Sequence, residues 1–316
     1  MARVIHTGQA LVDVVIEVPD LPARGQNVMA TSVTDYAGGA VTVLVAAARF
    51  GAECVHAGAH GTGPHGDLVR RALTGEGIGL SAPPVPEQDT GICVVLIEPS
   101  AERTFVTTLG AERQITGEWL ATSAPRPGDL VCVTGFSLAL EQTGVPLLAW
   151  LRTLDEGVVV VLDPGSAFAG LSPAVREEML ALTDVWTSNQ EEAVDLLVAL
   201  DRAPGSHDLA AVTAAIAPLL RGEAVTIVRD GAAGCAVFAA GETIVVPGFP
   251  QTPVDTNGAG DTHTGALMAE VAAGTPWAEG CRRANAAAAI KVTRRGPATA
   301  PTSSEVDAFL AEVSAR

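Results

Sequence analysis

From residue 129 onward, the sequence alternates short apolar, β-branched runs with longer helical patterns. Consecutive strands that are joined by helices lie parallel in one sheet, and such strands are buried on both faces. The apolar runs lie at 130–133, 158–162, 185–187 and 224–228, and the helical patterns at 138–154, 172–182, 190–200 and 207–220. This alternation predicts an α/β fold in which helices cover both faces of a mostly parallel central sheet.

The N-terminal part of the chain departs from this alternation. Extended segments follow one another within 11–36 without a helix between them, and 91–109 has the pattern of a hairpin. We expect these strands to form a small sheet that stands off the main one. No segment has the composition of a linker between domains, so we expect residues 1–316 to form a single domain.

The charge of the chain argues against several classes of partner. Acidic residues outnumber basic ones by 36 to 19, which gives a formal charge of −17. Such a surface repels nucleic acid and anionic membranes, so we expect neither as a partner. Five cysteines are scattered without a C-x-x-C pair, and no apolar run approaches the roughly 18 residues of a membrane span. These features favour a soluble, cytoplasmic protein with reduced thiols.

The scarcity of lysine limits how the chain can bind a phosphate group. Its one lysine is Lys291. The sequence therefore contains neither a G-x-x-x-x-G-K-[ST] phosphate loop nor the strand lysine of protein kinases. Any phosphoryl transfer has to use another cradle.

Residues 252–265 supply such a cradle, because they read as a loop that leads into the N-terminus of a helix. The Gly-Ala-Gly step at 258–260 has no bulky side chain, so a ligand can approach the backbone closely. The unpaired N–H groups of a first helical turn attract an anion. Asp261 at that turn can bind a metal or accept a proton from a hydroxyl group. The alternative interpretation is a glycine-rich turn followed by an aspartate N-cap.

The stretch DTNGAGD at 255–261, followed by Gly265, resembles the C-terminal signature of the PfkB, or ribokinase-like, family of carbohydrate kinases. The resemblance implies that Asp261 is the catalytic base. It also implies an anion hole for the transferred phosphoryl group. The amides of this anion hole belong to Gly258, Ala259 and Gly260. His263 departs from the family, which usually has Phe there as a packing residue.

The glycine pair at 38–39 resembles part of the family's N-terminal signature, in which Gly-Gly precedes an Asn that binds the sugar. Thr42 stands in the place of that Asn, so we expect the preferred acceptor to differ from ribose. Asp13 lies in an otherwise apolar strand, where a carboxylate is costly unless it is paired or solvated. The residues expected to contact the acceptor are Asp13, Gly38, Gly39 and Thr42. Read alone, the glycine pair is an ordinary turn before a helix.

Further motifs indicate a nucleotide site. Asn189 and Glu192 match the family's N-x-x-E motif, which acts on hydrated Mg²⁺ and the phosphates of ATP. By themselves, the two residues are a helix N-cap and its capping-box partner. The other residues that the resemblance assigns to the nucleotide are Arg229, Gly231, Gly234, Asn257 and Asn285.

The segment 292–296 resembles the ribokinase tail that holds a monovalent cation beside the anion hole. The resemblance therefore implies a bound K⁺, contributed largely by backbone oxygens. The residues that it assigns to this ion are Asp255, Asn257, Arg294 and Gly296.

One motif favours a different class of enzyme. Residues 61–66 satisfy G-x-G-x-x-G, which would make the chain an NAD(P)-dependent oxidoreductase. Pro64 has no N–H to offer a pyrophosphate, and the segment also resembles the family's G-x-D-x-x-G turn with Gly63 in place of Asp. A non-catalytic sugar-binding regulator on the same fold is a further alternative. The complete cradle at Asp261 argues against that alternative.

Over nearly the whole chain, the resemblance implies a ribokinase-like three-layer α/β/α fold whose small β-sheet is a lid over the acceptor. It implies ATP-dependent phosphorylation of a hydroxymethyl group of a sugar, with a nucleoside as the alternative acceptor. Mg²⁺ and K⁺ are the implied metal ions, and a homodimer through the lid strands is the implied assembly.

Overall fold

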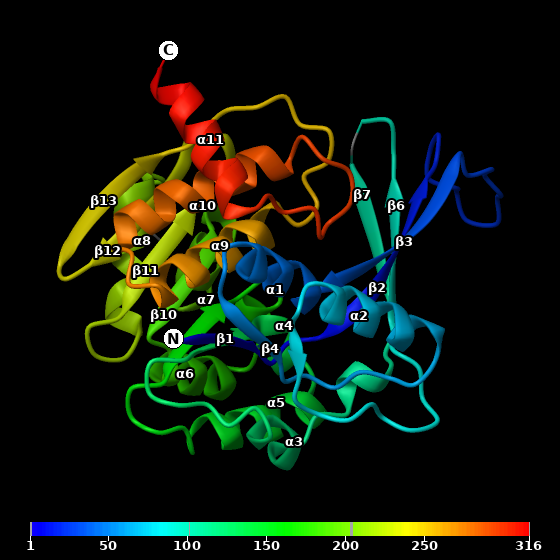
Figure 1. Ribbon diagram of the computed structural model, residues 1–316, viewed down its shortest axis with the longest axis horizontal. Helices are drawn as coiled ribbons and strands as arrows, with labels where there is room; N and C mark the ends of the chain where they lie inside the picture. The colour runs from blue at the N-terminus through cyan, green and yellow to red at the C-terminus, as the bar shows by residue number, and fades with distance from the viewer. Residues whose placement is uncertain (1, 101, 203–204, 316) are drawn as a thin grey trace.

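The computed structural model describes residues 2–100, 102–202 and 205–315, and within them the chain forms one large and one small β-sheet (Figure 1). The large sheet has the strand order β13-β12-β11-β10-β9-β8-β1-β4-β5. Its strands are β1 (Arg3–His6), β4 (Glu53–His56), β5 (Gly79–Leu80), β8 (Leu130–Thr134), β9 (Val159–Asp163), β10 (Val185–Asn189), β11 (Val225–Arg229), β12 (Gly234–Ala239) and β13 (Glu242–Pro247). Only β12 pairs antiparallel, with β11 and β13, among the described strands of this sheet. The expected mostly parallel central sheet is confirmed.

Helices cover both faces of the large sheet, as the alternation predicted (Figure 1). One core lies between the sheet and the helices α1 (Ala40–Arg49), α2 (Pro64–Gly75), α9 (Ala259–Ala272), α10 (Trp277–Lys291) and α11 (Ser303–Ser314). The opposite core is covered by α3 (Gly117–Ala121), α4 (Gly135–Leu138), α5 (Glu141–Leu151), α6 (Pro173–Leu182), α7 (Gln190–Ala199) and α8 (Leu209–Ile216). Short 3₁₀ turns lie at Ala111–Arg113, Phe168–Gly170, Ala217–Leu219 and Gly231–Ala233. None of the described helices is both long enough and apolar enough to cross a membrane.

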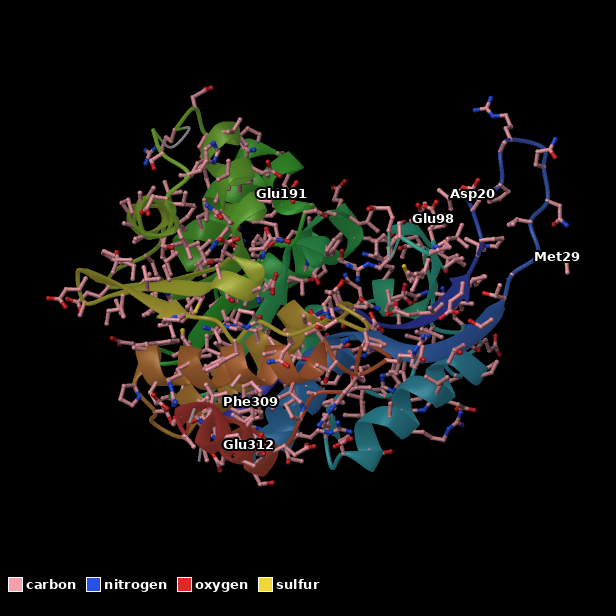
Figure 2. The ribbon with its side chains drawn as sticks, turned by 90° about the horizontal axis from the view of Figure 1, so that it is seen from above. Asp20, Met29, Glu98, Glu191, Phe309 and Glu312 are labelled. Carbon is pink, nitrogen blue, oxygen red and sulfur yellow. The ribbon has the colours of Figure 1, made fainter. Side chains whose placement is uncertain are left out.

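The small sheet contains the strands expected within 11–36 and 91–109. Its order is β3-β2-β6-β7. The strands are β2 (Ala10–Glu17), β3 (Ser32–Gly39), β6 (Ile92–Ile97) and β7 (Arg103–Thr107). The loop between β2 and β3, which carries Asp20 and Met29, projects away from the rest of the molecule (Figure 2). β3 continues through both glycines of the pair at 38–39 directly into α1, because Gly39 adopts a positive φ of 62°.

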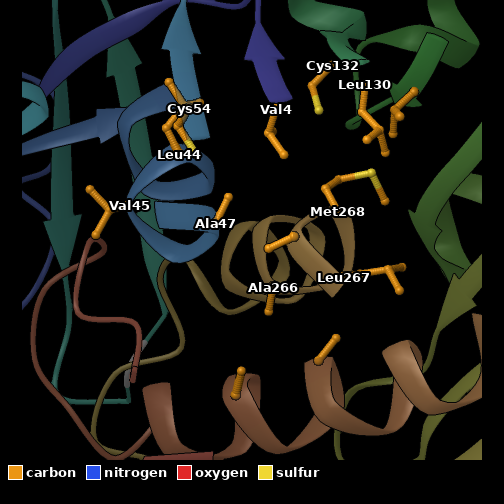
Figure 3. Packing of buried hydrophobic residues seen from close by; sticks show 14 of the residues in the cluster. Val4, Leu44, Val45, Ala47, Cys54, Leu130, Cys132, Ala266, Leu267 and Met268 are labelled. Carbon is orange, nitrogen blue, oxygen red and sulfur yellow. The ribbon is translucent and has the colours of Figure 1, made fainter. Parts of the chain in front are cut away.

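The crossing of α1 and α9 places the start of α9 against the small sheet. A Cβ atom at Gly265 would collide with the backbone carbonyl of Val43, so only glycine allows this close approach. Ala266 and Leu267 of α9 lie in the same core as Leu44 of α1 (Figure 3). The glycine that follows the DTNGAGD motif is therefore required by packing, and it holds Asp261 close to the residues of α1.

Candidate active site

Two cavities open at the carboxyl ends of the large-sheet strands, where open parallel sheets bind ligands. The small-sheet cavity, of about 470 Å³, is lined by residues of the small sheet and of α1. The large-sheet cavity, of about 530 Å³, is lined by the ends of β10 and β11 and by residues of α9 and α10. Asp163 and Asp261 line both cavities. The two cavities therefore meet at this pair of carboxylates.

Asp261 lies in the first turn of α9, directly after the Gly-Ala-Gly step. Gly258 is the N-cap of this helix and adopts a left-handed φ of 76°, which glycine tolerates. The N–H of Ala259 donates to the carbonyl of Thr256 at 3.2 Å, whereas no acceptor for the N–H groups of Gly260 and Asp261 is found among the described residues. These two free amides at a helix N-terminus form a seat for an anion.

The surroundings of Asp261 change its acidity. Burial first, and then the neighbouring charge of Asp163, raise the pKa of Asp261 to about 7, while Arg229 acts in the opposite direction. A general base is most effective when its pKa lies near the working pH. Asp261 is therefore suited to accept a proton from a hydroxyl group in the small-sheet cavity.

Arg229 ties the end of β11 to the first turn of α9. Its Nη1 donates to the carbonyl of Gly260 at 2.9 Å and to Thr264 Oγ1 at 2.8 Å. Its Nη2 lies 3.6 Å from Asp163 Oδ2, and Thr264 Oγ1 donates to that same carboxylate oxygen at 3.3 Å. This network fixes the backbone of the anion seat and holds a positive charge beside it. Sequence reasoning assigned Arg229 to the nucleotide but did not assign Asp163 or Thr264 to the site.

The residues that sequence reasoning placed at the acceptor gather around the small-sheet cavity. Asp13, Gly39 and Thr42 line it, and a Cβ atom at Gly38 would collide with the Asp13 carboxylate. Burial raises the pKa of Asp13 to about 6, and a hydrogen bond with the side chain of Asn257 partly opposes that shift. Asn257 lines this cavity and not the large-sheet cavity, so it lies on the other side from the nucleotide position assigned to it by resemblance.

Two polar groups in the small-sheet cavity make no hydrogen bond within the described parts of the chain. Thr42 is fully buried, and its Oγ1 makes no hydrogen bond there. The buried Nε of Arg113 likewise makes no hydrogen bond there, although it lies 3.7 Å from Glu112 Oε1, and the Nη1 of Arg113 donates to the carbonyl of Phe136 at 3.4 Å. Both groups can bind a polar ligand. Sequence reasoning missed Arg113, because no motif surrounds it and only the fold brings it to the cavity.

The large-sheet cavity collects most of the residues that were assigned to the nucleotide. Asn189 accepts from the N–H of Glu192 at 2.8 Å, and the carboxylate of Glu192 accepts from the N–H of Asn189 at 3.0 Å, so the capping-box interpretation holds. Both side chains also line the cavity. They are joined there by Arg229, Gly231, Gly234, His263 and Asn285.

The donor set of the large-sheet cavity fits a magnesium ion that is held mainly by a nucleotide. Burial first, and then the charge of Asp163, raise the pKa of Glu192 above its ordinary value, while the hydrogen bond from Asn189 and the charge of Arg229 partly oppose the shift. Two carboxylates that repel each other in this way favour a cation between or beside them. Within 2–100, 102–202 and 205–315, no group of three or more His, Cys, Asp or Glu side chains could hold a metal alone. Mg²⁺ usually keeps waters and binds one or two carboxylates plus phosphates, which this arrangement allows.

The residues assigned to a monovalent cation lie together beside the start of α9. Asp255 Oδ1 accepts from the N–H of Asn257 at 2.8 Å, and Asp255 Oδ2 accepts from the N–H of Gly296 at 2.9 Å. The guanidinium of Arg294 points elsewhere, because its Nη2 pairs with Glu305 at 2.5 Å. Lys291, which sequence reasoning used only to exclude phosphate loops, contacts the same segment through the carbonyl of Asp255.

The glycine-rich loop at 61–66 lines neither cavity. The N-terminus of α2, which a pyrophosphate would need, is already capped by Asp89. Its carboxylate accepts from the N–H of His65 at 3.1 Å and from that of Gly66 at 2.8 Å. A Cβ atom at Gly63 would collide with this same carboxylate. Asp89, which is distant in sequence, thus caps the helix as an Asp at position 63 would. Its carboxylate occupies the space of a side chain at position 63, which explains the glycine there.

Sequence comparison identifies relatives over nearly the full chain. The model of the pfkB family of carbohydrate kinases matches residues 1–304. An uncharacterised sugar kinase of Escherichia coli (strain K12), YegV, is 32% identical over 309 residues, which cover 96% of this chain and 92% of that protein. A ribokinase of Haemophilus influenzae is 29% identical over 306 residues, which cover 96% of each chain.

Solved structures share the fold. The ribokinase of Cryptococcus neoformans in complex with ADP aligns with a TM-score of 0.81 at 23% identity, covering 98% of this chain and 99% of that one. The ribokinase of Arabidopsis thaliana complexed with ribose and ATP aligns with a TM-score of 0.77 at 24% identity, with coverage of 98% and 99%. These similarities establish the three-layer architecture with its additional small sheet.

Proposed function

Since the chain belongs to the pfkB family of carbohydrate kinases and is an ATP-using sugar kinase, we propose that it phosphorylates a hydroxymethyl group of its acceptor, with Asp261 as the base. The observation that carries this proposal is the position of Asp261. It lies where the two cavities meet, beside the free amides of its own helix turn. The acceptor occupies the small-sheet cavity and ATP the large-sheet cavity, so that the attacking hydroxyl and the γ-phosphoryl group face each other across Asp261.

Each group at the junction has a task in this reaction. Asp261 takes the proton of the acceptor hydroxyl as the oxygen attacks phosphorus. The N–H groups of Gly260 and Asp261 donate to the phosphoryl oxygens. Because these donors are already oriented, they stabilise the charge of the transition state without reorganising. Arg229 holds the carbonyl of Gly260, which keeps that backbone turn in place. Asp13 accepts hydrogen bonds from further hydroxyl groups of the acceptor.

Mg²⁺ belongs to the proposal as a partner of the nucleotide. Glu192 and Asp163 would hold it through water, and Asn189 lies beside them on the large-sheet cavity. When bound, the ion neutralises the charge of the phosphate chain. The resemblance also implied a monovalent cation beside the first turn of α9, at Asp255, Asn257, Arg294 and Gly296.

The acceptor is proposed to be a sugar, with a nucleoside as the alternative, and its preference is proposed to differ from ribose. Thr42 supports that difference, because its single short hydroxyl offers fewer hydrogen bonds than the amide of an Asn. The test measures ADP release across a panel of pentoses, hexoses, their derivatives and nucleosides. Phosphorylation of a hydroxymethyl group on a sugar supports the proposal. Release of ADP with none of these acceptors contradicts it, and a nucleoside as best substrate selects the alternative.

We also propose that two copies associate through the small sheet. Val33 on edge strand β3 is 60% exposed, and Val106 on edge strand β7 is 58% exposed. Apolar side chains on the edges of a sheet favour contact with another copy. Light scattering should give the mass of a dimer, and Val33→Glu together with Val106→Glu should halve it. A monomeric parent protein would refute the proposal.

A cytoplasmic location is the last part of the proposal. All five cysteines are buried and unpaired, as in proteins of a reducing compartment. Fractionation of cells that produce the protein checks this location.

A further inference from the structure

Lys291 is the one lysine of the chain, and it is completely buried. It is the last residue of α10, and its Nζ donates to the carbonyl of Asp255 at 2.8 Å. The same Nζ lies 4.0 Å from Asp255 Oδ2. A buried ammonium is unfavourable unless a partner compensates it, and here Asp255 supplies both a carbonyl and a carboxylate. The contact with Asp255, in the loop before α9, therefore stabilises the buried ammonium of Lys291.

The oxygen atoms around Lys291 are already engaged as hydrogen-bond acceptors. Both carboxylate oxygens of Asp255 accept from backbone N–H groups, at 2.8 and 2.9 Å. The carbonyl of Gly296 accepts from Thr299 Oγ1 at 2.8 Å. The carbonyl of Val292 accepts from the N–H groups of Val254 and Asp255 at 2.7 and 3.1 Å. Each contact uses one lone pair of its oxygen, so these oxygens have fewer free positions for a cation while the Lys291 ammonium is present.

A monovalent cation does not fit this set of groups. Its ligands would include the carbonyl of Asp255, which Lys291 already contacts. The ion would then lie within a few ångströms of an ammonium group in a buried place, where like charges repel strongly. The Lys291 ammonium thus conflicts with the cation that the resemblance to the ribokinase tail implied.

We propose that the Lys291 ammonium occupies the role of the monovalent cation, so that the enzyme requires no K⁺. This inference rests on the kinase function proposed above. Lys291 acts as a positioning residue, because Asp255 in turn accepts from the N–H of Asn257, the residue before the N-cap Gly258. The contact of Lys291 with Asp255 therefore fixes the turn from which the amides of Gly260 and Asp261 emerge.

The first experiment uses the unmodified protein in chloride salts of K⁺, Na⁺ and tetramethylammonium at equal ionic strength. It measures kcat on the best acceptor, and it also measures the melting temperature and ADP affinity without any acceptor. We expect all three quantities to be the same in the three salts. A severalfold higher kcat in K⁺, or a melting temperature or ADP affinity raised by K⁺ alone, overturns the proposal. The last two readouts remain informative even if no acceptor is found, which separates this test from that of the kinase function.

A pair of variants tests the positioning role. Lys291→Ala removes the ammonium and opens space, whereas Lys291→Met removes the charge and fills the space. We expect both to lose kcat on the order of 10²-fold in tetramethylammonium, as a misplaced catalytic turn would cause. K⁺ should restore activity and raise the melting temperature of Lys291→Ala but not of Lys291→Met, an effect that a purely structural role would not produce. Full activity of Lys291→Ala in tetramethylammonium contradicts the proposal. If neither variant folds, the salt comparison on the unmodified protein decides.

Discussion

The walls of the two cavities are built in different ways. The large-sheet cavity is formed mostly by residues after position 188, from neighbouring strand ends and from α9 and α10, with glycines at several turns. The small-sheet cavity takes residues from both sheets, ranging from His6 to Pro297. Glycines bring backbone to the wall of the large-sheet cavity at several positions, whereas the wall of the small-sheet cavity consists more of side chains. We therefore expect the nucleotide side to be shared across the family and the acceptor side to determine specificity.

The largest expected effect is on kcat, at the junction of the two cavities. Loss of the base there should leave ligand binding in both cavities unchanged. Asp261→Asn should lower kcat by about 10²–10⁴-fold, which is typical for the loss of a general base. ADP affinity, measured by calorimetry, should remain unchanged because Asp261 lies at the end of the large-sheet cavity. Turnover close to that of the parent in a folded Asp261→Asn protein would refute the mechanism.

The pH dependence of the melting temperature shows whether the Asp261→Asn protein is folded as expected. The fold raises the pKa of Asp261 from 3.8 to about 7, so it favours the neutral carboxyl. Its contribution to stability is complete below pH 3.8 and is lost as the pH rises through 7. At pH 8 the ionised carboxylate therefore lowers the free energy of unfolding by a few kcal/mol. Asp261→Asn should therefore melt at a higher temperature than the parent at pH 8, and the difference should shrink at low pH.

The next effect tests whether the two walls act independently. Asp13→Asn removes a charged acceptor of hydrogen bonds, and such bonds contribute roughly 1.5–3 kcal/mol. The KM for the acceptor should rise by about 10- to 150-fold, whereas the KM for ATP should stay constant. Val14→Ala, a change at the next residue of β2, which does not line the cavity, is the matched control. An equal rise of both KM values would show that the walls are coupled.

The fold was more accessible from sequence than the acceptor site. The alternation after residue 129 predicted the parallel sheet, because burial on both faces leaves a strong apolar signal in runs such as 158–162. The motif around Asp261 predicted the anion seat, because a tight turn requires glycine at Gly258. These features depend only on residues that are neighbours in the sequence, so the sequence is sufficient to predict them.

Contacts between distant segments could not be predicted in this way. Arg113 reaches the small-sheet cavity from a 3₁₀ turn, and Asp89 caps α2 across 23 positions. Asp163 had a usable signal, since it follows a buried strand directly, but no motif surrounds it. Asn257 was assigned to the nucleotide because it belongs to the DTNGAGD motif, yet the fold turns it toward Asp13. Side-chain direction at such a turn depends on the packing of α9 and is not visible in the sequence.

A smaller expected effect concerns the pH dependence of kcat/KM, which tests how Asp163 influences Asp261. Asp261 must be deprotonated to act as a base, so kcat/KM for the acceptor should rise with pH through about 7 and level off above it. The Asp163 carboxylate helps to raise that pKa, so Asp163→Asn should lower it and move the rising limb to lower pH. The position of the limb is compared, not its height. A limb that stays in place would show that Asp163 does not influence the base.

The smallest expected effect concerns Thr42, where the acceptor wall differs most clearly from the family pattern. Its buried Oγ1 has no partner in the described residues and can make one short hydrogen bond to an acceptor. An Asn at this position offers a carbonyl and an amide that reach further. If ribose lacks one such bond, worth roughly 0.5–1.5 kcal/mol, Thr42→Asn should raise kcat/KM for ribose by up to about tenfold.

Thr42→Val is the control for the Thr42 prediction, since it keeps the shape of the side chain and removes only the hydroxyl. It should lower kcat/KM for the preferred acceptor and leave that for ribose nearly unchanged. Ribose as the best acceptor of the unmodified protein, with no response to Thr42→Asn, would contradict the expectation that this wall selects another sugar. Because Thr42 lines the small-sheet cavity and not the large-sheet cavity, the KM for ATP should stay constant in both variants. A change in that KM would mean that the substitution shifts the start of α9, because the methyl group of Thr42 packs against Gly258.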